Sequence, residues 1–141
     1  PDGSRVIFQA AGSSNQVIVA SPQGELLANL DDLSFARFGM VASWSGDGTR
    51  LAVGGSGGQC PFGIRVLDGT DFASIWAGNP PPNMCDPAFS PNGAFIAYAG
   101  VNPSIADGRR DLYVANNNGR GSVNITGDLR GEMVLLGWVA P

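Results

Sequence analysis

The chain has 141 residues, with 21 glycines, 10 prolines, two cysteines and a formal charge of −4. It contains no histidine and its eight basic residues are all arginine, which excludes His-dependent catalysis, imidazole zinc sites, Schiff bases and P-loops. We therefore expect no enzyme activity, no cofactor and no metal, and the scattered arginines of an acidic chain predict no nucleic acid partner. No apolar run approaches the roughly 18 residues of a membrane span, and Pro1 in place of methionine indicates a processed or excised piece.

A short turn motif recurs three times along the chain. Its glycines, Gly3, Gly48 and Gly93, lie 45 residues apart, and each is followed by an apolar run. Self-similarity of this period predicts three structural repeats, over approximately 1–45, 46–90 and 91–141, within one domain.

Each repeat is expected to contribute four short strands, because apolar runs alternate with Asp-Gly and Asn-Gly turns and no helical period is sustained. In chain order the expected strands are 5–8, 16–20, 25–30, 40–44, 50–53, 63–67, 72–76, 86–89, 94–98, 111–115, 122–126 and 133–138. Four strands per repeat of about 45 residues are typical of a β-propeller blade. The sequence therefore predicts an all-β fold built from propeller blades.

The third repeat carries a family resemblance. It reads Phe-Ser-Pro-Asn-Gly-Ala-Phe-Ile-Ala-Tyr over 89–98, then Asp-Leu-Tyr-Val-Ala over 111–115 and Asn-Ile-Thr over 124–126. This pattern resembles the PD40 repeat of TolB-type, WD40-like β-propellers, and the resemblance extends over nearly the whole chain. The second repeat departs from it, with Gly46 in place of proline. The resemblance implies protein contact, accessory domains of peptidases or sensor domains, with enzymatic activity in fused domains.

The connections between strands are unequal at the two ends of the expected blades. The long ones, 9–15, 54–62 and 99–110 within repeats and 31–39, 78–85 and 127–132 between them, share one face, which we expect to bind a partner. A solvated face with weak local ion pairs is the alternative. The candidate partner-binding residues are Arg37, Asp86, Asp107, Arg109, Arg110 and Asp111.

The aromatic residues Trp44, Phe89 and Trp138 recur at one repeat position, and we interpret them as packing between blades. Cys60 and Cys85 both fall on the long-connection face. Because propellers of this type resemble exported proteins and neighbouring connections can bring the two sulfurs together, we expect a disulfide; two free thiols are the alternative.

The ends of the chain bear on assembly. Propellers close with roughly four to eight blades, so three blades cannot close a ring. We expect the C-terminal strand of one copy to complete the N-terminal blade of another, with a six-bladed dimer favoured over a filament; blades missing from a longer propeller are the alternative. The exchanged residues would be Met133, Val134, Leu135, Leu136 and Trp138.

The functional prediction is a non-enzymatic interaction or self-assembly module, exported to the periplasm, the cell surface or the medium of a prokaryote. The expected partners are a second copy of the chain and another protein, without membrane insertion. The alternative is an accessory or gating propeller of a larger, peptidase-like enzyme or sensor.

Overall fold

The computed structural model describes residues 2–10, 16–30, 40–55, 63–76, 84–101, 105 and 108–139. Within these residues all regular secondary structure is β-strand, and no helix long and apolar enough to cross a membrane occurs in them. The strands are β1 Val6–Ala10, β2 Gln16–Ala20, β3 Leu26–Asn29, β4 Met40–Trp44, β5 Arg50–Gly55, β6 Ile64–Asp68, β7 Cys85–Phe89, β8 Phe95–Val101, β9 Arg110–Asn116 and β10 Val123–Asn124.

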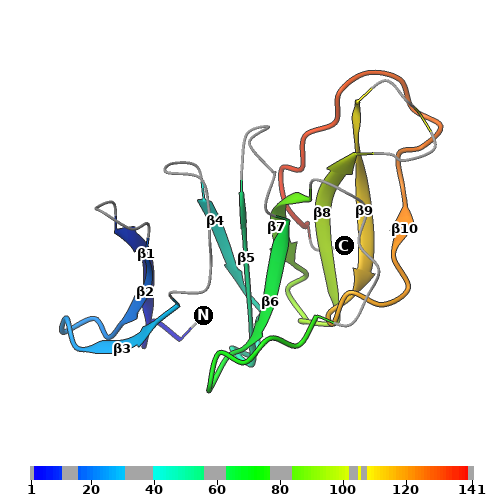
Figure 1. Cartoon of the computed structure of the whole chain (residues 1–141). Helices are drawn as coiled ribbons and strands as arrows, with labels where there is room; N and C mark the ends of the chain where they lie inside the picture. Colours follow the sequence, from blue (N-terminus) through cyan, green and yellow to red (C-terminus); the bar gives the residue numbers. More distant parts are fainter. Residues whose placement is uncertain are drawn as a thin grey trace.

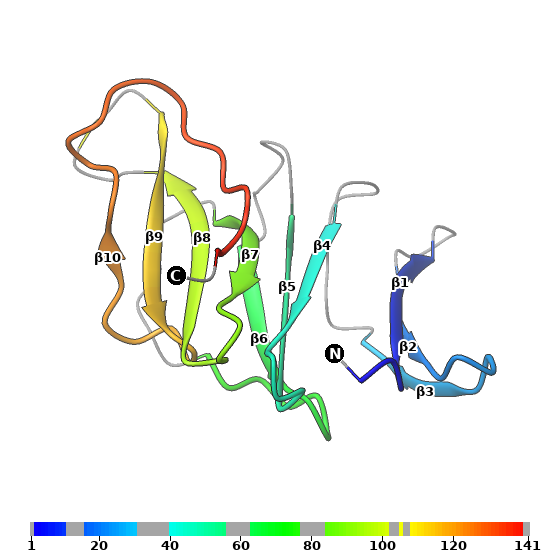
Figure 2. The same cartoon turned by 180° about the vertical axis from the view of Figure 1, so that it is seen from behind.

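The strands form three antiparallel groups that follow the chain order. Unit 1 is β1-β2-β3, unit 2 is β4-β5-β6 and unit 3 is β7-β8-β9-β10. A single parallel bridge from Gly55 to Cys85 links units 2 and 3. Figure 1 shows the units standing beside one another, with the N-terminus at unit 1 and the C-terminus at unit 3, and Figure 2 shows the same order from behind. The expected all-β architecture is therefore confirmed.

The repeated motif builds a hydrogen-bonded turn, seen most fully in unit 2. The Ser45 hydroxyl donates to Asp47 Oδ1 at 2.6 Å and accepts the Arg50 backbone N–H at 3.0 Å. Asp47 Oδ1 also accepts the backbone N–H of Thr49 at 3.0 Å. Gly48 has a φ of 71°, a left-handed conformation that favours glycine. The motif thus specifies the turn chemically.

The same turn recurs in the other units. In unit 3 the Ser90 hydroxyl donates to Asn92 Oδ1 at 2.7 Å and accepts the Phe95 backbone N–H at 3.0 Å. In unit 1 Asp2 Oδ1 accepts the Ser4 backbone N–H at 2.9 Å. An aspartate or asparagine side chain can fill this role because its oxygen reaches the N–H two residues on.

Two apolar layers hold the units together, and each lies between neighbouring units. Between units 1 and 2 the buried residues are Val17, Val19, Leu30, Leu51, Val53 and Leu67, with Ile7, Ala28, Met40, Ala42, Trp44 and Phe72 packed against them. Between units 2 and 3 they are Ala52, Ile64, Val66, Met84, Phe89, Ile96, Tyr98, Tyr113 and Ala115. Alternation along each strand sends successive side chains to opposite faces, so Leu51 and Val53 contact unit 1 while Ala52 contacts unit 3.

One expected strand is wrong. In 72–76 only Ser74 pairs, through one bridge to Leu67, because Phe72 has a φ of 60° and turns the chain out of the sheet. The Phe72 ring instead packs edge-on against Trp44 at 6.4 Å. The segment 133–138 forms no strand with any described residue of the same chain, and Gly137 within it has a φ of 139°; its pairing with another copy stays a prediction.

Candidate partner-binding site

Asp111 lies inside β9 rather than in an exposed loop. Its side chain is 0% exposed, and Asn124 Nδ2 donates to its Oδ2 at 2.8 Å. Arg109, whose side chain is 15% exposed, places its NH2 3.7 Å from Asp111 Oδ1. In the single chain Asp111 is thus buried and pairs with Arg109, and its contact with a partner stays a prediction. The segment 124–126 also binds β9 beside Asp111: the Thr126 hydroxyl accepts the Leu112 backbone N–H at 2.9 Å.

Arg110 ties three elements together. Its NH1 donates to Cys85 Sγ at 3.5 Å and its NH2 pairs with the Glu132 carboxylate. Cys85 begins β7 and is 0% exposed. Arg110 thus links β9 to β7 and to the start of the C-terminal segment, which is a structural role.

A cavity of about 290 Å³ opens beside Arg109. It is lined by Ile105, Arg109, Gly127, Asp128, Leu129 and Arg130. The turn that carries the last four residues is closed by a hydrogen bond from the Leu129 backbone N–H to the Thr126 carbonyl, at 2.9 Å. Two arginines from different segments therefore line one cavity, together with Leu129, which is 54% exposed. Arginine forks bind carboxylates in a bidentate geometry.

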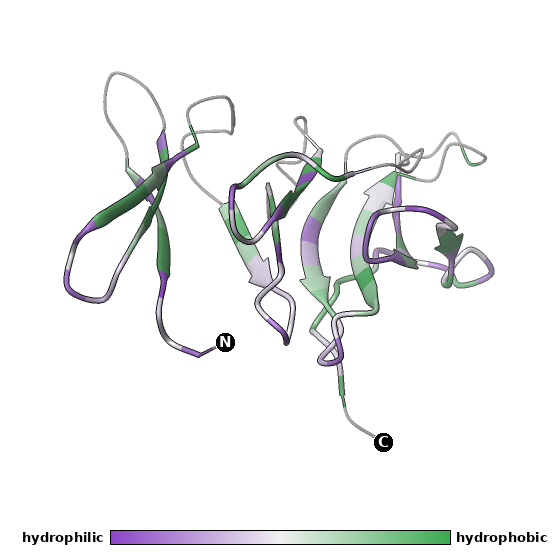
Figure 3. Ribbon diagram, turned by 90° about the horizontal axis from the view of Figure 1, so that it is seen from below, coloured by the Kyte–Doolittle hydropathy of each residue, from purple (hydrophilic) through white to green (hydrophobic). Residues whose placement is uncertain are grey.

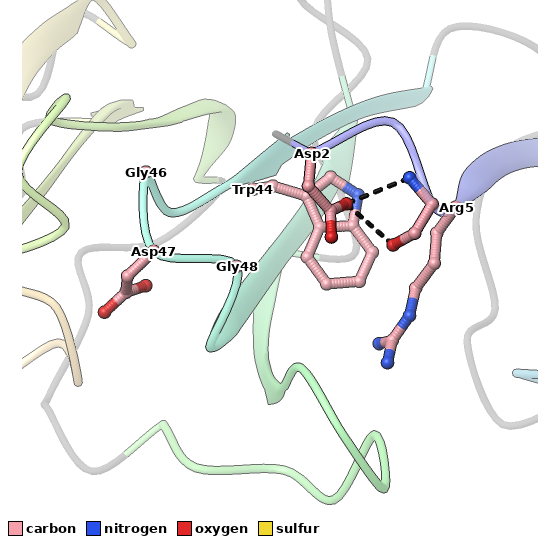
Figure 4. Close-up of a pocket in the computed structure, with 7 residues that line it drawn as sticks. Asp2, Arg5, Trp44, Gly46, Asp47 and Gly48 are labelled. Carbon is pink, nitrogen blue, oxygen red and sulfur yellow. Dashed lines mark hydrogen bonds between the residues drawn. The ribbon is translucent and has the colours of Figure 1, made fainter.

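A second cavity, of about 200 Å³, lies between the turns of units 1 and 2 (Figure 4). Its polar groups are already engaged. Arg5 donates to the Gly69 carbonyl and stacks 5.7 Å from the Trp44 ring centre. Hydrogen bonds from the Ser45 hydroxyl and then from Thr49 lower the pKa of Asp47 to about 2. In Figure 4 Asp47 points away from Arg5 and Trp44, so these groups do not converge on a ligand position.

The other predicted site residues are dispersed. Asp86 is half-buried in an irregularity of β7 and has a φ of 53°. Arg37 and Asp107 lie outside the described residues. Cys60 does as well, so its pairing with Cys85 stays a prediction, although the described part of the chain contains no free thiol.

Two of the three recurring aromatics occupy inter-unit positions. Phe89 is 6% exposed in the layer between units 2 and 3, and Trp44 packs against the layer between units 1 and 2. Trp138 is half-buried, and its Nε1 donates to the Ala88 carbonyl at 2.9 Å.

Sequence reasoning missed Leu129 and Arg130. Both lie in the connection 127–132, which the sequence singled out only by its length. Arg109 belongs to the earlier connection 99–110, and β9 and β10 lie between the two. Their convergence depends on the pairing of β9 with β10, and no local pattern encodes it.

No protein-family model matches this sequence, and no curated protein sequence matches it either. Solved structures do share its fold. The crystal structure of TolB from Acinetobacter baumannii matches with a TM-score of 0.67 and 15% identity, over 89% of this chain and 30% of the TolB chain. The structure of putative TolB from Agrobacterium tumefaciens matches with a TM-score of 0.58 and 18% identity, over 89% of this chain and 43% of the other.

These likenesses define a TolB-like β-propeller fold. At this identity they show the fold alone, and the chain spans less than half the length of either neighbour. The fold-level part of the predicted resemblance is confirmed, while membership of the PD40 family stays a prediction because no family model matches.

Proposed function

We propose that the chain is a non-enzymatic, exported propeller module that binds a protein partner through the cavity beside Arg109 and Arg130. The observation that carries this proposal is the pair of arginines at one cavity, one of them held by the buried carboxylate of Asp111. An arginine fixed in this way loses less side-chain freedom on binding, which favours affinity.

The chemistry of the cavity favours a carboxylate next to an apolar side chain, such as the last residue of a polypeptide. The guanidinium groups would bind the carboxylate, and Leu129 would contact the apolar chain. Asp111 and Asp128 balance the two positive charges locally. Recognition would therefore depend on hydrogen-bond geometry rather than on net charge, and binding would be salt-tolerant compared with a basic patch.

Peptides that end in leucine test this proposal. We expect a peptide with a free C-terminal carboxylate to shift the NMR signals of the Gly127–Arg130 turn. The same peptide with a C-terminal amide should bind at least ~10-fold more weakly, because a charge-assisted hydrogen bond of about 1.5–3 kcal/mol is lost. Arg130→Gln should weaken binding to a similar degree. Arg120→Gln, in the exposed turn after β9, is the matched control. Equal binding of both peptides, or equal loss in both variants, would contradict the proposal.

Export and the lack of catalysis rest on other support. The sequence lacks histidine and lysine, and the fold neighbours are TolB structures. A test is the fate of the natural gene product: after cell fractionation it should be found outside the cytoplasm.

An accessory or gating propeller of a larger protein is the second candidate. It is favoured because the matched TolB chains extend well beyond the part that this chain matches. A hydrolase domain in the same natural polypeptide, whose activity or substrate range changes when the propeller is removed, would support this candidate over the first.

A further inference from the structure

Unit 1 exposes apolar side chains at positions that are buried in the other two units. By the repeat spacing, Val6 corresponds to Leu51 and Ile96, and Phe8 corresponds to Val53 and Tyr98. The four residues in units 2 and 3 are each 0% exposed, whereas Val6 is 49% and Phe8 is 44% exposed. In units 2 and 3 these positions pack against the preceding unit. Unit 1 therefore presents a face shaped for a preceding unit, and none of the described residues covers it.

The edge of the same unit is also open. β5 pairs with β4 and β6, and β8 pairs with β7 and β9, but β1 pairs only with β2 among the described strands. An unpaired edge strand leaves backbone N–H and C=O groups available to another strand. What β1 lacks is the equivalent of β4 or β7.

The C-terminal segment has the sequence of that missing strand. With Trp138 aligned on Trp44, Val134 and Leu136 correspond to Met40 and Ala42, which pack against the apolar layer between units 1 and 2. In the C-terminal segment these two side chains are 68% and 96% exposed. Figure 3 shows hydrophobic colour both on the strands of unit 1 and just before the C-terminus.

A chain cannot bring this segment to its own β1. Units 1 and 3 stand at opposite ends of the row of units, with the C-terminal segment beside β7 and β8 (Figures 1 and 2). The hydrogen bond from Trp138 Nε1 to the Ala88 carbonyl keeps it on unit 3. Among the described residues, pairing of this segment with β1 therefore requires a second molecule.

We propose that residues 134–138 of one copy pair antiparallel with β1 of a second copy. The register follows from β4 and β5, in which Trp44 lies opposite Leu51 and Ala42 opposite Val53. By equivalence Trp138 lies opposite Val6, and Leu136 opposite Phe8. This pairing seats unit 3 of one copy against the exposed face of unit 1 of the next. The contact is head-to-tail, so two copies make a closed ring of six units when the rotation closes and a filament when it does not.

The mass in solution tests the proposal. Light scattering of the 141-residue chain should give twice the monomer mass of 14.5 kDa, or a larger species that grows with concentration. Leu136→Asp should weaken association at least 10-fold without loss of the β-sheet circular dichroism, because Leu136 is almost wholly exposed in the single chain. Val123→Asp, on the outer edge of β10 and 59% exposed, is the matched control. A monomer at every concentration, or association that survives Leu136→Asp, overturns the proposal.

The register has its own test. Copies carrying Phe8→Cys, mixed with separately tagged copies carrying Leu136→Cys, should form a mixed disulfide identified by mass spectrometry of the linked peptides. Gln9→Cys in place of Phe8→Cys should form little, because its side chain lies on the other face of the strand. Equal cross-linking in both mixtures refutes this register. Neither substitution touches the cavity at Arg130, so carboxylate binding and self-association can succeed or fail independently.

Discussion

Leu51→Ala measures how much the layer between units 1 and 2 contributes to stability. Leu51 is 0% exposed and belongs to the buried cluster of that layer. Truncating a fully buried leucine costs about 2–5 kcal/mol, from lost transfer energy and from the cavity left behind. With a urea dependence of about 2 kcal/mol per molar for a domain of this size, a loss of about 3 kcal/mol lowers the unfolding midpoint by about 1.5 M. Since domains are stable by about 5–15 kcal/mol, the variant should remain folded in buffer.

The assay is urea unfolding followed by tryptophan fluorescence and circular dichroism. Leu26→Ala is the control, because Leu26 is 63% exposed on β3 and its truncation should change stability by no more than about 0.5 kcal/mol. Equal midpoints for the two variants, at an unchanged slope, would refute the inter-unit layer as a core. Val6→Ala, at the position equivalent to Leu51, should lower the unfolding midpoint no more than the control does in dilute solution. At concentrations where copies associate, it should lower the midpoint more.

Three further predictions concern single sites. Gly46→Ala should destabilise the protein by about 1–3 kcal/mol in the same unfolding assay, because a Cβ there would lie 1.9 Å from the Pro91 carbonyl oxygen. The folded-state pKa of Asp47 is about 2 against 3.8 unperturbed, so the stability that its carboxylate contributes is complete above pH 3.8 and is lost as the pH falls through 2. Asp47→Asn, which retains an acceptor oxygen, should remove this pH dependence of stability between pH 3.8 and 2 in acid-unfolding curves. A carboxyl pKa near 3.8 by NMR would contradict this. Cys60 and Cys85 should resist alkylation in the native protein until reductant is added, and mass spectrometry that finds two freely alkylated thiols would exclude the disulfide.

The repeat was predictable because each turn is encoded locally. Ser45 and Asp47 make their hydrogen bonds within five residues of themselves, so the same letters yield the same turn wherever they recur. Strand positions follow from the turns, and nine of the twelve expected runs largely coincide with strands of at least four residues. The departures are the short strand β10, the segment 72–76 with its single bridge, and the segment 133–138, which forms no strand with any described residue.

The candidate site was only partly predictable, because its geometry depends on contacts between distant segments. The charged residues around Arg109 and Arg110 predict a polar loop, whereas in the structure β9 begins at Arg110 and Asp111 is buried. Burial of Asp111 against Asn124 arises only when β9 pairs with β10, so the sequence could not separate the anchoring carboxylate from the residues left at the surface. Gly46, which replaces the proline of the repeat pattern, also reflects a contact between distant segments. The turn of the next unit lies against Gly46 and leaves no space for a side chain.

The direction of stacking links the fold to assembly. Each unit has two unlike faces, since the positions of Leu51 and Val53 contact the preceding unit and the position of Ala52 contacts the following one. In unit 3 the position of Ala52 is held by Ala97, which is 4% exposed. The exposed face of unit 1, with Val6 and Phe8, corresponds to the face that contacts the preceding unit in units 2 and 3, so a second copy of the same face is not its equivalent partner. Under the proposed self-association, the contact would therefore run head-to-tail, and the rotation between copies would determine whether a ring closes or a filament grows.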